Sequence, residues 1–258
     1  MAASKFYERA EVIHEVAEAK RSRICHDLIA DLLRRGLGNE VSKLLDVGCG
    51  DGSFAARFKQ CCRVTGVDVS QYAVELANKA GIDARRVDIS HEALPFEDGS
   101  FDLVYMGDII EHLLNPDFAI GEVFRVTRPH GFLVLSTPNL ASWLNRLLLL
   151  VGMQPMFTEV STVRSFGRPG RQAFSPVGHL RLFTYRALRE FLAFHGFNII
   201  ETQGASHKEL PRILKQGDEI VSGIPSLSSI IIVVAQKSGQ RINCGSISCA
   251  SSKLASNI

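Results

Sequence analysis

The chain is predicted to be an α/β protein with a mainly parallel sheet and helices on both faces. Short apolar stretches alternate with amphipathic stretches from residue 43 to residue 195. This alternation requires crossover connections, which make successive strands parallel and cover both faces of the sheet. A glycine-rich turn at 48–52 follows the first apolar stretch, as in nucleotide-binding α/β folds. The 258 residues, 46% hydrophobic and 22% charged, suffice for one large domain.

The individual elements follow from hydrophobic periodicity. Residues 5–35 have helical spacing closed by Gly36 and Gly38, so we expect two helices there. Apolar runs predict the strands Lys43–Val47, Arg63–Val67, Ala84–Asp88, Phe101–Met106 and Gly131–Ser136. The helices predicted between and after them are Ser53–Lys59, Gln71–Ala80, Pro116–Val126 and Thr184–His195.

The last elements break the alternation. Asn198–Thr202 and Ile230–Ala235 are predicted strands separated by an irregular segment, 204–229. A closing hairpin of this kind beside a parallel sheet would make the sheet mixed.

A long insert follows the fifth predicted strand. Residues 138–182 have no strand period and contain one short apolar helix, Trp143–Val151. An insert of this length in a compact domain usually forms a lid or a binding segment. We expect a single domain over 1–238, with N-terminal helices in 1–37, and a disordered tail at 239–258.

Composition narrows the possible functions. The net charge of +2 gives no argument for a nucleic acid or an anionic membrane as partner. The first 23 residues lack the apolar core of a secretory signal, and no apolar run could span a bilayer, so we expect a cytoplasmic protein. The six cysteines form no Cys-x-x-Cys pair and have no nearby histidine at zinc-ligand spacing. No metal site is therefore predicted.

Acidic residues stand at the carboxyl ends of successive predicted strands, where open parallel sheets bind ligands. Asp46 lies in the first strand, Asp68 follows the second and Asp88 ends the third. A carboxylate after the second strand suits a ribose diol, and one after the third can accept from an adenine amine. Gly107, after the fourth strand, leaves room for an adenine face. Because the turn lacks Gly-Lys-Ser/Thr, we predict a site for adenosine with a non-phosphate substituent.

Four motifs follow one another in residues 40–137. They are Leu-Leu-Asp-Val-Gly-Cys-Gly-Asp-Gly-Ser (44–53), Gly-Val-Asp-Val-Ser (66–70), Leu-Pro-Phe-Glu-Asp-Gly-Ser-Phe-Asp-Leu-Val (94–104) and Ile-Glu-His-Leu (110–113). Together they resemble class I S-adenosylmethionine-dependent methyltransferases, most nearly the small-molecule branch (type 11) that includes quinone-biosynthesis O-methyltransferases. Residues 178–197 resemble this branch more weakly. The resemblance implies a Rossmann-like α/β/α sandwich with a seven-stranded, mostly parallel sheet whose last strand is antiparallel.

The resemblance also implies S-adenosylmethionine as cofactor and a role for each position. The glycines of the turn would surround the methionine end, while Asp46 would hold backbone or contact the ammonium. Asp68 would bind the ribose. Asp88, at the end of the third strand, would bind the adenine amine, and Ile89 would lie on the adenine face. The implied cofactor-binding residues are Asp46, Gly48, Cys49, Gly50, Gly52, Asp68, Val69, Asp88, Ile89, Gly107 and Asp108. Asp88 could instead cap the turn that follows it.

Two histidines are candidate catalytic residues. His112 or His179 could act as general base toward an acceptor hydroxyl, because an unperturbed imidazole has a pKa of about 6.5. His112 could equally pack at a helix end and bond to backbone. Arg181 is a candidate contact for the acceptor, but His179 and Arg181 could merely precede the helix that Thr184 caps. Methyl transfer mainly requires in-line alignment, and a carboxylate acceptor would need no base.

The insert and the residues after it have a distinctive composition. No acid lies between Glu159 and Glu190, and six arginines alternate with aromatic residues there. A basic, aromatic lid would favour an anionic acceptor, whereas a solvated loop would have the same composition. The apolar run Leu147–Val151 could be a pocket wall for a lipid-like acceptor, a membrane-touching flap or ordinary core.

Three other functions stay open. A nucleic-acid (tRNA or rRNA) methyltransferase would place the arginines on phosphates, but the low net charge counts against it. A non-catalytic S-adenosylmethionine-binding protein would keep the same strand ends. A nicotinamide oxidoreductase is disfavoured because Ser53 stands where its fingerprint has a third glycine. Nothing in the sequence indicates an oligomeric state.

Overall fold

A computed structural model of the protein describes residues 20–35, 42–167, 176, 178–206 and 212–238. The strands are β1 (Lys43–Val47), β2 (Arg63–Asp68), β3 (Asp83–Arg86), β4 (Phe101–Gly107), β5 (Thr127–Pro138), β6 (Phe197–Ala205) and β7 (Ile230–Lys237). The α-helices are α2 (Lys20–Arg34), α3 (Gln71–Lys79), α4 (Pro116–Val126), α5 (Trp143–Leu150), α6 (Tyr185–Phe194) and α7 (Arg212–Val221). Two 3₁₀ turns, η1 (Ala55–Phe58) and η2 (Ile110–His112), follow β1 and β4.

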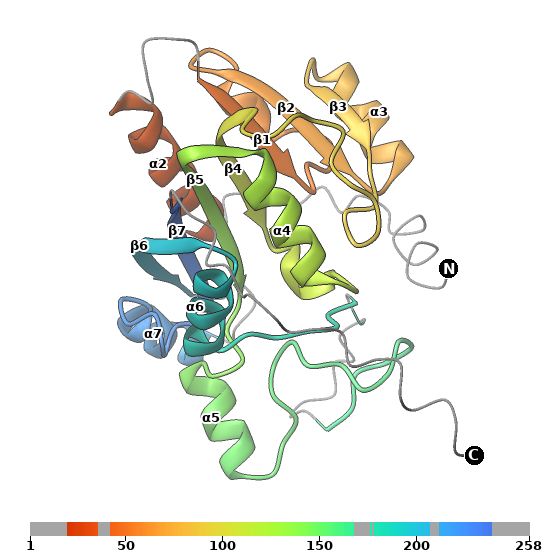
Figure 1. Cartoon of the computed structure of the whole chain (residues 1–258). Coiled ribbons are helices and arrows are strands. Elements are labelled where there is room, and N and C mark those ends of the chain that lie inside the picture. The colour runs from red at the N-terminus through yellow and green to blue at the C-terminus, as the bar shows by residue number, and fades with distance from the viewer. Residues whose placement is uncertain (1–19, 36–41, 168–175, 177, 207–211, 239–258) are drawn as a thin grey trace, which may run out of the picture.

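The strands form one seven-stranded sheet in the order β3-β2-β1-β4-β5-β7-β6 (Figure 1). β7 is antiparallel to both of its neighbours, and the pairs from β3 to β5 are all parallel. The predicted mixed sheet with an antiparallel last strand is thus confirmed. The strand order reverses between β1 and β4, which is where this class of sheet binds ligands.

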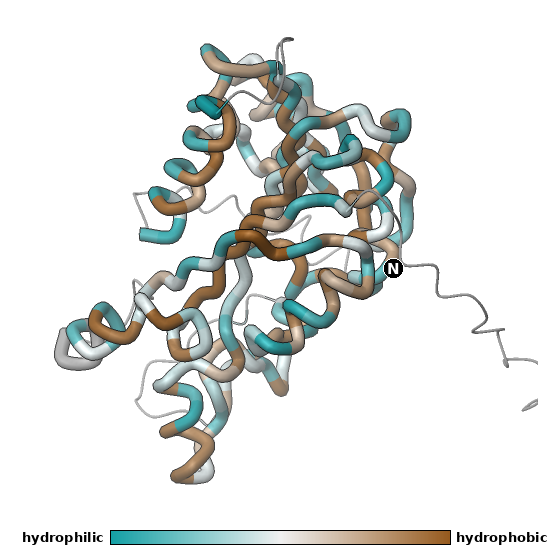
Figure 2. The backbone as a smooth tube through the Cα atoms, turned by 60° about the vertical axis from the view of Figure 1, so that its left-hand side comes forward, coloured by the Kyte–Doolittle hydropathy of each residue, from teal (hydrophilic) through white to brown (hydrophobic). Residues whose placement is uncertain are grey.

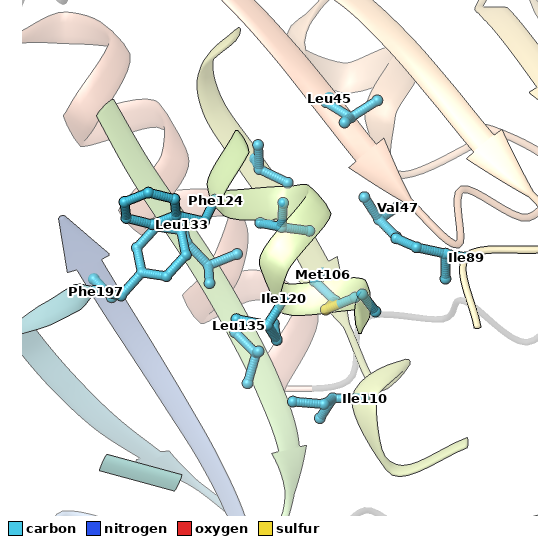
Figure 3. Packing of buried hydrophobic residues seen from close by; sticks show 14 of the residues in the cluster. Leu45, Val47, Ile89, Met106, Ile110, Ile120, Phe124, Leu133, Leu135 and Phe197 are labelled. Atoms are coloured by element: carbon cyan, nitrogen blue, oxygen red, sulfur yellow. The ribbon is translucent and has the colours of Figure 1, made fainter. Parts of the chain in front are cut away.

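Two hydrophobic clusters hold the layers together. Alternate residues of a strand face opposite sides of the sheet. Leu45 and Leu133 therefore belong to the cluster on the side of α4 and α6, part of which Figure 3 shows, whereas Leu44 and Val134 belong to the cluster on the side of α2 and α3. The central strands are the most hydrophobic part of the chain, and the helices are amphipathic (Figure 2). Burying one large aliphatic side chain contributes about 1.5–3 kcal/mol. The buried sheet therefore positions the loops at its carboxyl edge.

Local sequence signals set the helix boundaries. The Ser70 hydroxyl accepts a hydrogen bond from the backbone of α3, and the Asn115 side chain does the same for α4, with Pro116 in its first turn. Thr184 caps α6 by accepting from the N–H of Ala187, as predicted. Among the helices of the described segments, none has the length and apolar character needed to cross a membrane.

Three expectations about elements are wrong. The helix expected at Ser53–Lys59 is instead the single 3₁₀ turn η1. The segment 204–229 is not irregular, because it contains α7. Gly217 lies in the interior of this helix, and a glycine there lowers the intrinsic helix propensity of the segment. The strand expected at Ala84–Asp88 ends at Arg86.

The insert after β5 begins at the carboxyl edge of the sheet, and α5 lies beyond that edge (Figure 1). Leu148 of α5 is buried, whereas Leu147, Leu149 and Leu150 are exposed, so the expectation of ordinary core holds for part of this run only. The expectations for residues 1–19, for the tail at 239–258 and for Arg168, Arg171 and Phe174 fall outside the described residues.

Candidate active site

The turn after β1 has three glycines in left-handed conformations. Gly48, Gly50 and Gly52 have φ values of +76°, +53° and +76°. A Cβ on Gly48 would collide with Ile109, and one on Gly52 would press on α3. A Cβ on Gly50 would meet nothing within 4 Å. Packing therefore requires glycine at 48 and 52, while the backbone at 50 stays open to the close approach of a ligand.

Hydrogen bonds fix this turn to β2. The backbone N–H groups of Gly48 and Cys49 donate to the carbonyl of Val67 at 2.8 and 3.0 Å. The Asp68 carboxylate accepts from the N–H of Gly50 at 2.9 Å and of Ser70 at 2.8 Å. A carboxylate oxygen has two lone pairs, so Asp68 can hold the turn and still accept from ligand hydroxyls.

A second carboxylate lies buried near Asp68. Burial and the charge of Asp68 raise the pKa of Asp46 to about 7. Burial also raises the pKa of Asp68, although the N–H groups of Ser70 and Gly50 oppose this rise. A ligand that brings positive charge and hydroxyl donors would stabilise both carboxylates in their ionised form. The two acids therefore fit an adenosine with a cationic substituent.

The predicted adenine-binding residues lie just beyond β3. Asp88 accepts from the N–H of Ser90 at 3.0 Å, and its other oxygen lies 3.1 Å from Nδ1 of His91. Turn capping, the alternative foreseen for Asp88, is thus present. Ile89 is buried in the core cluster that includes Val47, and Val69 is half-buried after β2.

An ion pair joins the end of β4 to α2. Arg21 lies 3.0 Å from Asp108, and the Ser136 hydroxyl donates to the other Asp108 oxygen at 2.9 Å. A Cβ on Gly107 would collide with the hydroxyl of Tyr105, so packing also restricts this glycine. The sequence did not reveal Arg21, because it lies in a helix without a recognisable motif and far along the chain from Asp108.

The two candidate histidines meet at a buried glutamate. The imidazole rings of His112 and His179 have centroids 4.7 Å apart, and Nε2 of His179 lies 4.0 Å from Oε1 of Glu111. Thr137 donates to Oε2 of Glu111 at 3.0 Å, while Oε1 has no hydrogen-bond partner in the described segments. Burial, followed by the charge of Asp108, raises the pKa of Glu111 well above its ordinary range. Burial and the neighbouring His179 lower the pKa of His112 to about 4.

Backbone contacts bring these residues together. The carbonyl of Glu111 accepts from the N–H groups of Leu180 at 2.8 Å and Arg181 at 3.0 Å. The Arg181 guanidinium donates to the carbonyl of Leu113 at 3.0 Å, so this side chain ties the segment after the insert to η2. His112 bonds through Nδ1 to the carbonyl of Gly178 at 3.2 Å, which is the backbone contact foreseen as its alternative.

Several described residues of the expected basic, aromatic lid make contacts outside the candidate site or face solvent. Arg186 pairs with Glu190 at 2.8 Å on the exposed face of α6. Phe183 and Tyr185 pack against the core cluster, whereas Phe166 is exposed. For these residues the structure favours ordinary packing and a solvated face.

Comparison with known proteins identifies the domain. Residues 45–135 match the family model described as a methyltransferase domain. The chain carries a class I S-adenosylmethionine-dependent methyltransferase domain. A probable S-adenosylmethionine-dependent methyltransferase from Mycolicibacterium smegmatis is 31% identical over 182 residues, which are 68% of this chain and 58% of that protein. The cofactor of this family is S-adenosylmethionine.

A second curated relative and one solved structure are also similar to the chain. The 27-O-demethylrifamycin SV methyltransferase of Amycolatopsis mediterranei is 37% identical over 117 residues, 42% of each chain. The crystal structure of 1,6-didemethyltoxoflavin-N1-methyltransferase from Burkholderia thailandensis, with 1,6-didemethyltoxoflavin and S-adenosylhomocysteine bound, superposes with a TM-score of 0.56. It is 19% identical and the match covers 92% of this chain and 87% of that one, which shows a shared fold. The chain spans about half the length of the two curated relatives that it matches.

Proposed function

We propose that the protein transfers the methyl group of S-adenosylmethionine to a small-molecule acceptor. The observation that carries this proposal is the pair of carboxylates formed by buried Asp46 and half-buried Asp68, beside the open backbone of Gly50. The pair lies at the edge where the strand order reverses.

The residues around this pair would hold the cofactor. Asp68 would accept from the ribose hydroxyls while keeping its bonds to the turn. Asp46 would face the ammonium of the methionine part, and Asp88 the adenine amine, with Ile89 and Val69 beside the ring. When bound, S-adenosylmethionine supplies a methyl group that is electrophilic because it is attached to a positively charged sulfur. The chain then needs mainly to align the acceptor with that methyl group.

The acceptor would lie toward η2. His112 is uncharged at neutral pH because its pKa is lowered to about 4, so it can accept a hydrogen bond from an acceptor hydroxyl. Arg181 is engaged with the carbonyl of Leu113 and Arg186 with Glu190, which gives little support to an anionic acceptor. The exposed leucines of α5 favour an apolar one. A relative named for its action on a rifamycin supports a small-molecule substrate.

A methyl-label experiment tests the acceptor class. The purified chain is incubated with methyl-labelled S-adenosylmethionine and either total cellular RNA or the small-molecule fraction of the same cells. We expect label in the organic-extractable small molecules and none in RNA. Label in RNA that declines steeply with salt would favour the nucleic-acid alternative instead. The variant Asp68→Ala serves as a control for cofactor-dependent labelling.

A further inference from the structure

We propose that Glu111, His112 and His179 form a binding site for a divalent first-row transition-metal ion, Zn²⁺ included. Each residue offers one ligand atom, and the three atoms lie within 4.8 Å of one another. Two imidazole nitrogens and one carboxylate oxygen are a common donor set for such ions.

The hydrogen bonds of the two histidines set their tautomers. Nδ1 of His112 lies 3.2 Å from the carbonyl of Gly178, and Nδ1 of His179 lies 3.1 Å from the carbonyl of Phe157. A carbonyl oxygen can only accept, so each Nδ1 must carry the proton. In the neutral ring Nε2 then has a lone pair, and a backbone carbonyl on the other nitrogen is the usual orienting partner of a metal-bound histidine.

The glutamate completes the set. Glu111 is fully buried, and Thr137 holds Oε2 at 3.0 Å. The other oxygen, Oε1, points toward Nε2 of His179 at 4.0 Å and has no hydrogen-bond partner among the described residues. A buried carboxyl oxygen left in this state is unfavourable, and a cation between it and the two imidazoles would remove the deficit.

The backbone holds the ligands close to bonding geometry. The glutamate carbonyl accepts from Leu180 and Arg181, so the two segments that supply the ligands are joined next to the site. Bonds of about 2.0–2.2 Å to a metal ion require the ligand atoms to move together by roughly 1 Å. Rotation of the side chains about their outer bonds can supply this movement without a change in the backbone.

The donor set restricts the ion. Imidazole suits Zn²⁺, Fe²⁺, Co²⁺ and Ni²⁺, whereas Mg²⁺ and Ca²⁺ prefer oxygen ligands. Three protein ligands leave coordination positions open. If the proposed function holds, on which this step rests, the ion would polarise an acceptor oxygen and favour loss of its proton. The neutral histidines would then serve as ligands and not as general bases.

Calorimetry with the metal alone tests the site. The full chain is freed of metal by dialysis against a chelator and titrated with Zn²⁺, and separately with Co²⁺ while its visible absorption is recorded. We expect one ion per chain, with affinity at least about tenfold lower in Glu111→Gln, His112→Gln and His179→Gln. His195→Gln is the matched control, because His195 also faces a carboxylate, that of Asp117 at 3.1 Å, outside the site. This variant should bind like the wild type.

Failure of this inference is distinguishable from failure of the proposed function. S-adenosylmethionine binding is measured in the same metal-free samples and should persist in all four variants. Absence of Zn²⁺ binding in the wild type, or equal affinity in wild type, Glu111→Gln and His179→Gln, would overturn the metal site and leave the histidines as candidate bases. Where a variant does not fold, anomalous scattering from wild-type crystals soaked in Zn²⁺ locates the ion. An ion bound away from Glu111 would equally overturn the site.

Discussion

The proposed cofactor side and the proposed acceptor side of the site are built differently. The residues proposed to bind the cofactor come from positions 46–89, where an acidic residue stands close to the carboxyl end of each of the first three strands. The acceptor side joins η2, Thr137 of β5 and the segment 178–181, and Arg21 of α2 reaches the border between the two sides. Short-range sequence motifs encode the first side, whereas long-range contacts assemble the second. We therefore expect changes on the cofactor side to act locally and changes on the acceptor side to loosen segments that are distant in sequence.

The largest expected effect compares two glycines of the turn. Gly48→Ala should lower the free energy of unfolding by about 2–4 kcal/mol, because its Cβ would strike Ile109 in a left-handed conformation. Gly50→Ala should cost only about 1 kcal/mol, the conformational penalty alone. Urea unfolding measures both. Equal losses would mean that the close contact with Ile109 is not present in solution.

The next effect concerns the border between the two sides. A double-mutant cycle with Arg21→Met and Asp108→Asn should give a coupling energy of about 1 kcal/mol, because the pair is partly buried. Urea unfolding of the four proteins gives this value. A coupling energy near zero would indicate that α2 is not held at the site by this pair.

A pH titration sharpens the comparison on the cofactor side. The pKa of Asp46 rises from 3.8 to about 7 on folding, so its contribution to stability is complete below pH 3.8 and is lost as the pH rises to about 7. Affinity for S-adenosylmethionine should change in the opposite direction, increasing up to about tenfold per pH unit until the pH reaches about 7, since the ammonium favours the ionised carboxylate. Calorimetry should show a flatter profile for Asp46→Asn. An unchanged profile would place the ammonium elsewhere.

The smallest effect is expected on the exposed face of α6. Arg186→Ala removes a solvent-exposed pair with Glu190, and such pairs contribute little. The urea midpoint and the affinity for S-adenosylmethionine should both stay unchanged. A clear loss of acceptor turnover in this variant would instead support the hypothesis of a basic lid over the site.

The sequence predicted local elements better than long-range contacts, for a physical reason. β1 and α4 have the predicted boundaries, because an apolar run and an Asn-Pro cap are local signals. The meeting of Glu111 with His179 depends on hydrogen bonds to a segment far along the chain, and no spacing rule reports it. The contacts of buried Asp218 with Trp143 and Ser229, and the partner of Arg21, were hidden for the same reason. The sequence named both histidines as candidates, but not their shared carboxylate.

Calorimetry tests the assignment of the cofactor side most directly. The wild type and Asp68→Ala are each titrated with S-adenosylmethionine and, separately, with NAD. Asp68 links the turn at Gly50 to the place where the ribose would bind. We predict that the wild type binds S-adenosylmethionine and not NAD, and that Asp68→Ala weakens this affinity at least about tenfold, or 1.4 kcal/mol. Unchanged affinity in Asp68→Ala, or binding of NAD without S-adenosylmethionine, would contradict the assignment.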